Sequence, residues 1–290
     1  MGRPKNPSLL EEGFRQAEAV TRRHARTFHL ASRFLSAEKR RACYAVYAAC
    51  WLCDQAVDGL DPAPLAQLEA ARQRLQCAYD ARRPNEDPLM AALRETVITY
   101  DIPQRYFEDM LEGMQMDLSK TRYAAFGELF LYCYRVAGVV GLMMARVFGA
   151  ETPEAEKHAL DLGIASQLTN ILRDIKEDYG RGRIYLPQDE MAAAGVTEDD
   201  IAQGNVTAGF AALMRRQIER ARSYYREGGK GLEAIIDRNA RLVAALIADL
   251  YERVLDGIER QRYNVFARRC DVPLVEKIWA ASKIILRPSP

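Results

Sequence analysis

The chain has 290 residues, 49% of them hydrophobic, and a formal net charge of +1. This length can bury a large core, and the balanced charge gives no electrostatic case for a nucleic-acid partner, because the arginines are spread among acidic residues. By inspection, no apolar run reaches the ~20 residues of a membrane span, and no signal-type segment follows the N-terminus, so we expect a cytoplasmic protein.

Apolar residues recur at intervals of three and four along most of the chain, whereas strand alternation is nearly absent. Pro103 and Thr152-Pro153 mark helix starts, and Gly149 and Gly180 mark helix ends. Helices are predicted over 8–24, 37–57, 64–80, 88–100, 103–118, 126–148, 153–179, 208–229 and 239–262. The chain is therefore predicted to be all-α, with ligand sites on the inward faces of a bundle.

The short segments that contain proline and glycine between these helices are too brief and too varied to be linkers. We therefore expect one domain over residues 1–290, with 1–7 and 287–290 flexible. Most of the six cysteines fall within apolar helical stretches, which is typical of reduced packing residues. Cys50 and Cys53 form a single CxxC, for which a zinc or redox role is the alternative.

Two acidic pairs share a four-residue spacing, Asp54 with Asp58 and Asp174 with Asp178. On a helix, residues four apart lie on one face with β-carbons about 5–6 Å apart, so each pair presents two carboxylates side by side. Such like charges repel unless a cation lies between them, and magnesium prefers oxygen ligands. The repeated spacing predicts a magnesium diphosphate site, and a solvated helix face is the alternative.

Polar residues extend the second acidic pair along its predicted helix. Gln167, Asn170, Asp174 and Asp178 occupy an arc of roughly 80° at about 100° per residue. Aligned amides and carboxylates beside leucine and isoleucine residues indicate one polar wall of a cavity, because a solvated face more often carries lysine and glutamate.

Two glycines, Gly138 and Gly141, lie inside the apolar segment Tyr132–Gly141. Glycine in a helix interior costs about 1 kcal/mol relative to alanine, so its presence needs a reason. Close approach of another helix, room for a long ligand chain, and ordinary core packing are the three explanations.

Together these segments resemble the squalene and phytoene synthase family, all-α prenyltransferases that join two isoprenoid diphosphates head to head, and most closely its bacterial-type phytoene synthases. The similarity covers most of residues 20–270. Its motifs are Arg26–Phe28, Ala45–Ala48, Asp54–Asp58, Glu112–Leu118, Tyr132–Gly141, Gln167–Asp174, Glu177-Asp178 and Arg181–Asp189.

The resemblance implies an isoprenoid-synthase-type helical bundle around a central cavity. It assigns magnesium, with manganese as an alternative ion, to ligands in two facing motifs: Asp54, Asp58, Asn170, Asp174 and Asp178. Tyr132 would steer the carbocation or help the departing diphosphate take a proton. The catalytic residues implied are therefore Tyr132 and the four aspartates of the two motifs. Further substrate contacts would come from Asp117, Gln167, Arg173, Arg183, Tyr251 and Arg268. Arg181 and Arg183 could instead cap a helix C-terminus.

The reaction implied is condensation of two geranylgeranyl diphosphates to phytoene through a cyclopropylcarbinyl diphosphate, with release of diphosphate. The alternative is a C30 squalene or dehydrosqualene synthase that uses farnesyl diphosphate, and NADPH would be needed only for squalene. No glycine-rich dinucleotide motif follows a strand here. A non-catalytic prenyl-binding or assembly protein is the alternative from another functional class, but such relatives typically lose aspartates that this chain retains.

Three positions depart from the family pattern. Trp51 stands where phytoene synthases usually carry arginine, Gln55 where they commonly carry glutamate, and Gln115 replaces another arginine. The first change places an indole on roughly the same helix face as Asp54, which predicts weaker diphosphate affinity or a shifted substrate. The basic, amphipathic C-terminal segment Lys277–Arg287 is a candidate for peripheral contact with a membrane, and packing on the bundle is the alternative.

Overall fold

Helices account for most of the residues that the computed structural model describes, which are 7–58, 63–80, 82, 86–150 and 152–273. Within these ranges there is no strand, only an isolated bridge between Arg122 and Ile184. The longer helices are α1 (Pro7–His24), α3 (Ala37–Asp58), α4 (Pro64–Tyr79), α5 (Pro88–Thr99), α6 (Gln104–Ser119), α7 (Phe126–Cys133), α8 (Val139–Phe148), α9 (Pro153–Arg173), α13 (Ala208–Gly229) and α14 (Arg238–Arg260). The all-α prediction is confirmed.

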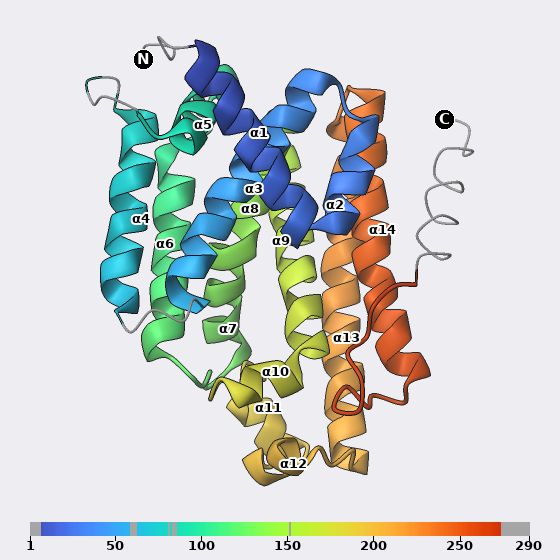
Figure 1. Cartoon of the computed structure of the whole chain (residues 1–290). Coiled ribbons are helices and arrows are strands. Elements are labelled where there is room, and N and C mark those ends of the chain that lie inside the picture. The colour runs from blue at the N-terminus through green and yellow to red at the C-terminus, as the bar shows by residue number, and fades with distance from the viewer. Residues whose placement is uncertain (1–6, 59–62, 81, 83–85, 151, 274–290) are drawn as a thin grey trace.

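Helix α9 lies at the centre of the bundle, where it contacts α8, α13 and α14. Helices α1, α3, α4, α5 and α6 pack on one another and form the other side (Figure 1). The long helices run up and down, so their inward faces surround a common space. The predicted flexible ends, apart from Pro7 at the start of α1, and the predicted membrane-binding tail Lys277–Arg287 lie outside the described residues.

The short helices were not predicted from the sequence. They are α2 (Arg26–Ala31), α11 (Gln188–Ala193), α12 (Glu198–Gln203) and the 3₁₀ turns η1 (Ser32–Phe34) and η3 (Lys230–Ala234), whereas α10 (Ile175–Gly180) falls within the helix predicted over 153–179. A helix of six residues makes fewer than two turns, so it gives no periodic signal of its own. For α12 a local signal did exist, because Thr197 and Asp200 form a capping box.

The helix predicted over 153–179 is interrupted at Asp174, which corrects that prediction. Helix α9 ends at Arg173, Asp174 has φ −105° and ψ 18°, and α10 begins at Ile175. Backbone hydrogen bonds still link Asp174 to Asn170 and Asp178 to Asp174, both at 2.9 Å. The second acidic pair therefore keeps its four-residue hydrogen-bond connection although the helix bends between its members.

Helices α7 and α8 join through a π-helical turn, η2 (Tyr134–Gly138), into one helical run. This run lies close to α9 through its glycines: a Cβ on Gly141 would lie 2.3 Å from the Ala159 carbonyl oxygen, and one on Gly163 would lie 2.4 Å from that of Ala137. Close helix approach thus accounts for Gly141. Rare π turns often occur at functional sites.

The run Phe126–Phe148 is also the one helix of the described residues that is long and apolar enough to cross a membrane. Inspection of the sequence did not identify this segment, because the charged residues Glu128, Arg135 and Arg146 interrupt its run of apolar residues. In the structure this run packs against α6 and α9 and contributes to the wall of the internal cavity. The apolar residues of this run are therefore explained by its packing inside the bundle.

Candidate active site

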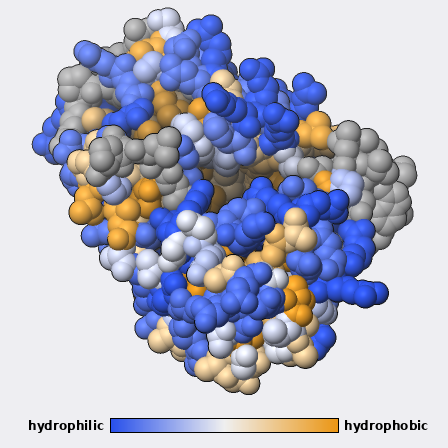
Figure 2. Space-filling view, turned by 60° about the horizontal axis from the view of Figure 1, so that its bottom comes forward, coloured by the Kyte–Doolittle hydropathy of each residue, from blue (hydrophilic) through white to orange (hydrophobic). Residues whose placement is uncertain are grey.

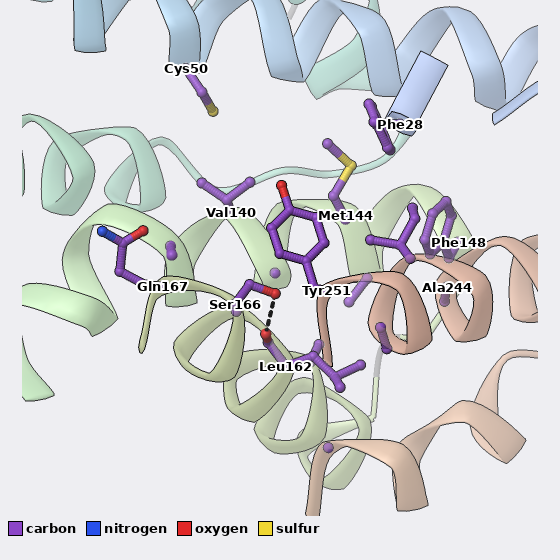
Figure 3. A pocket seen from close by; sticks show the side chains of 18 of the residues that line it. Phe28, Cys50, Val140, Met144, Phe148, Leu162, Ser166, Gln167, Ala244 and Tyr251 are labelled. Atoms are coloured by element: carbon purple, nitrogen blue, oxygen red, sulfur yellow. Dashed lines mark hydrogen bonds between the residues drawn. The ribbon is translucent and has the colours of Figure 1, made fainter. Parts of the chain in front are cut away.

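A cavity of about 450 Å³ lies inside the bundle, between α2, α3, α8, α9, η3 and α14. Figure 3 shows Phe28, Val140, Met144, Phe148 and Tyr251 directed into it from different helices. Most of the wall is apolar. The polar side chains of Asp54, Gln167, Asn170 and Tyr251 lie along it, all four among the predicted site residues.

The cavity is elongated along α9. Residues of this helix line it from Ala155 to Asn170, a separation of about 22 Å at 1.5 Å per residue. The end remote from Asn170 is formed by Phe148, His158 and Ile235 together with Gly231, whose missing side chain leaves room for the His158 ring. Figure 2 shows a hollow on the lower face of the molecule, with hydrophobic surface inside and hydrophilic residues around it.

The first acidic motif occupies the last turns of α3. Asp54 lines the cavity, and its negative charge contributes, after burial, to raising the pKa of Cys50 to about 12. Asp58 is the last residue of α3, and its side chain lies outside the described atoms. Asp54 on α3 and Asn170 on α9 thus line one cavity, as the facing-motif prediction requires.

Two arginines hold Asp174 of the second motif. Arg173 donates to it at 2.7 and 2.5 Å, and Arg269 donates at 2.7 and 3.0 Å. Burial alone would raise the pKa of this carboxyl, but the hydrogen bonds and charges of the two arginines outweigh burial and keep the pKa below its ordinary value. Asp174 is therefore ionised and already paired.

Asp178 has the opposite electrostatic environment. Burial, followed by repulsion from Asp174, raises its pKa to about 7, although the charges of Arg181 and Arg183 act in the other direction. The backbone N–H of Arg183 donates to the Asp178 carbonyl at 2.9 Å, which holds the loop against α10. A buried carboxyl beside other carboxylates is a position where an added cation would favour the ionised form.

Tyr132 belongs to a buried hydrogen-bonded triangle with Asp117 and Tyr185. Its hydroxyl donates to Asp117 Oδ2 at 2.9 Å and lies 3.3 Å from the Tyr185 hydroxyl, which donates to Asp117 Oδ1 at 2.7 Å. Burial, followed by the charge of Asp117, raises the pKa of Tyr132 far above its usual range, so the phenol stays protonated. Asp117 also contributes to the raised pKa of Asp178, so the triangle lies beside the second motif.

The three departures from the family pattern differ in position. Trp51 lines the cavity and stacks on His24 at the end of α1, with ring centroids 4.7 Å apart. Gln55 and Gln115 are exposed. Only Trp51 therefore changes the surface that a bound substrate would touch.

Sequence reasoning missed two contacts at this site. Arg269 binds Asp174 although the prediction named its neighbour Arg268, and both arginines are exposed. Tyr185 lies in the Arg181–Asp189 motif, which was recognised, but its bond to Asp117 spans 68 residues of sequence. A hydrogen bond between residues so far apart in the sequence leaves no pattern that local periodicity could reveal.

Asp54 and Asn170 contribute oxygen donors to the cavity wall, whereas Asp174 and Asp178 do not line the cavity and follow one and two turns beyond Asn170. This arrangement suits a divalent cation that shares its ligands with a phosphate group. Among the residues whose side chains are described, no three acidic, histidine or cysteine side chains converge into a preformed metal cluster. The donor set therefore fits a cation that the protein binds by a few carboxylates together with substrate oxygens.

The family model for squalene/phytoene synthase matches residues 21–276. A chloroplastic phytoene synthase of an Oncidium hybrid cultivar is 42% identical over 97% of this chain and 70% of its own, and phytoene synthase 2 of Solanum lycopersicum is 42% identical over 95% and 90%. The crystal structure of a dehydrosqualene synthase superposes with a TM-score of 0.88 at 29% identity, over 95% of this chain and 96% of that one. These matches, together with a cavity lined by Asp54 and Asn170, lead to one conclusion: the chain belongs to the squalene/phytoene synthase family.

Proposed function

We propose that this protein is a phytoene synthase, a prenyltransferase that condenses two geranylgeranyl diphosphates head to head and releases diphosphate. The observation that carries the proposal is an apolar cavity with Asp54 and Asn170 in its wall and the second acidic motif one turn beyond Asn170. Relatives that are about 42% identical over nearly the whole chain bear the name phytoene synthase. The elongated shape suits long prenyl chains.

The chain's own residues bind and orient the two diphosphates at the end of the cavity that Asp54 and Asn170 line. Asp54, Asp58, Asn170, Asp174 and Asp178 would hold magnesium, which would stabilise the negative charge that develops on a departing diphosphate. Arg173, Arg183 and Arg269 offer guanidinium groups for bidentate contacts with phosphate oxygens. The hydrogen bonds of Arg173 and Arg269 to Asp174, which keep both guanidinium groups beside the second motif, support this role.

The apolar wall protects the allylic carbocation that ionisation leaves behind. Phe28, Met144 and Phe148 exclude water, so that the double bond of the second chain attacks the cation and gives a cyclopropylcarbinyl diphosphate. Ionisation of that intermediate, rearrangement and loss of a proton complete the route to phytoene without a reductant. The buried hydroxyl of Tyr132, positioned by Asp117, is the candidate for assisting the departing diphosphate.

A C30 product is the second candidate, since two structural relatives are named as C30 enzymes. They are the dehydrosqualene synthase above and squalene synthase from Alicyclobacillus acidocaldarius, which is 29% identical with a TM-score of 0.82 over 89% of this chain and 97% of that one. Their identity to this chain is lower than that of the phytoene synthases. We therefore favour geranylgeranyl diphosphate.

The test is product analysis by mass spectrometry after incubation of the purified protein with magnesium and either geranylgeranyl or farnesyl diphosphate, with and without NADPH. A C40 triene formed without NADPH is the expected result. A C30 product moves the assignment to dehydrosqualene or squalene synthesis according to the reductant. Absence of product from either substrate contradicts the proposal, and an Asp54→Asn variant controls for contaminating activity.

Two further predictions form part of this proposal. Residues 1–290 act as one domain, which is supported by two hydrophobic clusters that share Val136, Leu160 and Val272 as packing partners. The relatives are named as chloroplastic, and for this chain we retain a cytoplasmic location with peripheral membrane contact. Fractionation of cells that produce the protein would test the location.

A further inference from the structure

Helix α2 contributes to the cavity wall, and together with the turn η1 it carries an unusual outer face. Phe28 of α2 points into the cavity. On the outside, Arg26, Leu30, Arg33 and Phe34 are all exposed and follow helical spacing, so they form one stripe. Leu30 is 49% exposed and Phe34 is 41% exposed. Large apolar side chains thus alternate with arginines on the solvent side of a cavity wall.

A second element repeats this arrangement beside the stripe. Ile235 lines the cavity, while the adjacent Ile236 is 89% exposed and precedes the exposed Arg238. Both η1 and α2 contact α14, and Lys39, shortly after η1, binds Asp237 at 2.8 Å. Figure 1 shows α2 beside the upper half of α14. We call the six residues Arg26, Leu30, Arg33, Phe34, Ile236 and Arg238 the outer patch.

The charges of the outer patch favour an anionic partner. In the described part of the chain, none of its three arginines forms an ion pair with an acidic side chain. Exposed arginines around protruding leucine, phenylalanine and isoleucine side chains match the chemistry of a bilayer surface, where cations meet phosphate headgroups and apolar side chains enter the acyl boundary.

We propose that the outer patch docks the protein onto a bilayer that contains anionic lipid, and that the cavity wall made by α2 and Ile235 then faces the membrane. Docking itself is independent of the reaction. Its use for delivering the product to the bilayer rests on the proposed function, because a C40 hydrocarbon has no favourable route through water. The wall between the cavity and the bilayer would be one helix thick.

The test is flotation of the full-length protein, without substrate, with vesicles of phosphatidylcholine alone or mixed with phosphatidylglycerol. The wild-type protein should bind the mixed vesicles more strongly. The triple variant Leu30→Glu/Phe34→Glu/Ile236→Glu should bind them about tenfold or more weakly, and Arg26→Glu/Arg33→Glu/Arg238→Glu should lose mainly the dependence on phosphatidylglycerol. Circular dichroism and the thermal midpoint establish that each variant is folded.

Matched controls are Leu65→Glu and Leu131→Glu, which alter apolar residues 63% and 44% exposed on α4 and α7. They should bind as the wild type does. The inference is overturned if the wild type binds no vesicles, if the triple variant binds as well as the wild type, or if the controls lose as much. It is also overturned if Lys277→Glu/Lys283→Glu abolishes binding while the triple variant keeps it, because the C-terminal segment would then be the anchor. None of these outcomes depends on which product the enzyme makes.

Discussion

The indole of Trp51 stacks on the imidazole of His24, with ring centroids 4.7 Å apart, in the wall that also carries Asp54. An arginine at this position would instead present a guanidinium to a bound diphosphate. We expect Trp51→Arg to lower KM about tenfold, equivalent to ~1.4 kcal/mol, with little change in kcat. Steady-state kinetics with geranylgeranyl diphosphate would measure this. Trp51→Phe, which keeps an aromatic ring, is the control, and an unchanged or raised KM for Trp51→Arg would count against the idea.

Removal of the Tyr132 hydroxyl should impair turnover more than binding. Asp117 keeps its bond from Tyr185 in Tyr132→Phe, so we expect a stability loss of about 1 kcal/mol and a fall in kcat of roughly tenfold or more at unchanged KM. Tyr134→Phe is the matched control, because that hydroxyl donates to Asp109 at 2.9 Å and takes no part in the triangle around Asp117. Equal losses of kcat in both variants would argue for a purely structural role.

The length of the substrate should depend on the end of the cavity remote from Asn170. Ala244 lines the cavity near Phe148 (Figure 3), so Ala244→Phe would fill that end. We expect the ratio of kcat/KM for geranylgeranyl over farnesyl diphosphate to fall about tenfold or more, since a clash costs about 1–3 kcal/mol. The exposed Ala192→Phe controls for general effects. If the ratio stays constant while both substrates react, this end of the cavity does not set chain length.

The buried pair of Glu190 and Arg220 should make stability depend on pH. Burial tends to raise the pKa of Glu190, but the hydrogen bonds and charge of Arg220 outweigh it and leave the pKa lowered. A carboxyl with a lowered folded pKa stabilises the protein above its unfolded pKa and loses that contribution as pH falls through the folded value.

Glu190→Gln should therefore reduce the free energy of unfolding by about 2 kcal/mol at pH 7, and the difference from wild type should shrink below about pH 4. Urea unfolding at both pH values would measure it. The exposed pair of Glu219 and Arg226 supplies the control, since Glu219→Gln should cost less than about 0.5 kcal/mol. A cost for Glu190→Gln that is constant across pH would contradict the electrostatic explanation.

Close packing of α9 against η2 should make Gly163 intolerant of any side chain. The added Cβ of Gly163→Ala would lie 2.4 Å from a backbone oxygen, so we expect a loss of about 3 kcal/mol in stability. Gly127→Ala is the control: no atom lies within 4 Å of its Cβ position on α7, and helix propensity should stabilise the protein by about 0.5–1 kcal/mol. Chemical denaturation of the two variants would compare them, and similar stabilities would contradict the packing argument.

The sequence predicted the long helices because each buries an apolar face with a 3.6-residue period, and it predicted Asp54, Gln167 and Asn170 because they interrupt those faces with polar groups at helical spacing. The comparisons confirm the family. What the sequence missed depends on contacts between distant segments. Arg269 reaches Asp174 across 95 residues, and the bend at Asp174 occurs where that contact is made.

The resemblance supplied Tyr132 and Asp117 as separate candidates, but their hydrogen bond emerges only when α6 and α7 pack together. The outer patch was not predicted either. Four of its residues lie on α2 and η1, which are too short to give a periodic signal in the sequence. Ile236 and Arg238 come from a segment about 200 residues away. Local periodicity therefore predicts the helices of this fold, whereas long-range packing decides which side chains meet.

The two arginines on Asp174 have a consequence for the order in which the site fills. They neutralise the carboxylate when no substrate is present, so a divalent cation that arrives alone must compete with both of them for its oxygens. A diphosphate offers these arginines a more highly charged partner and leaves the carboxylate free for the cation. Cation and diphosphate should therefore each strengthen the binding of the other.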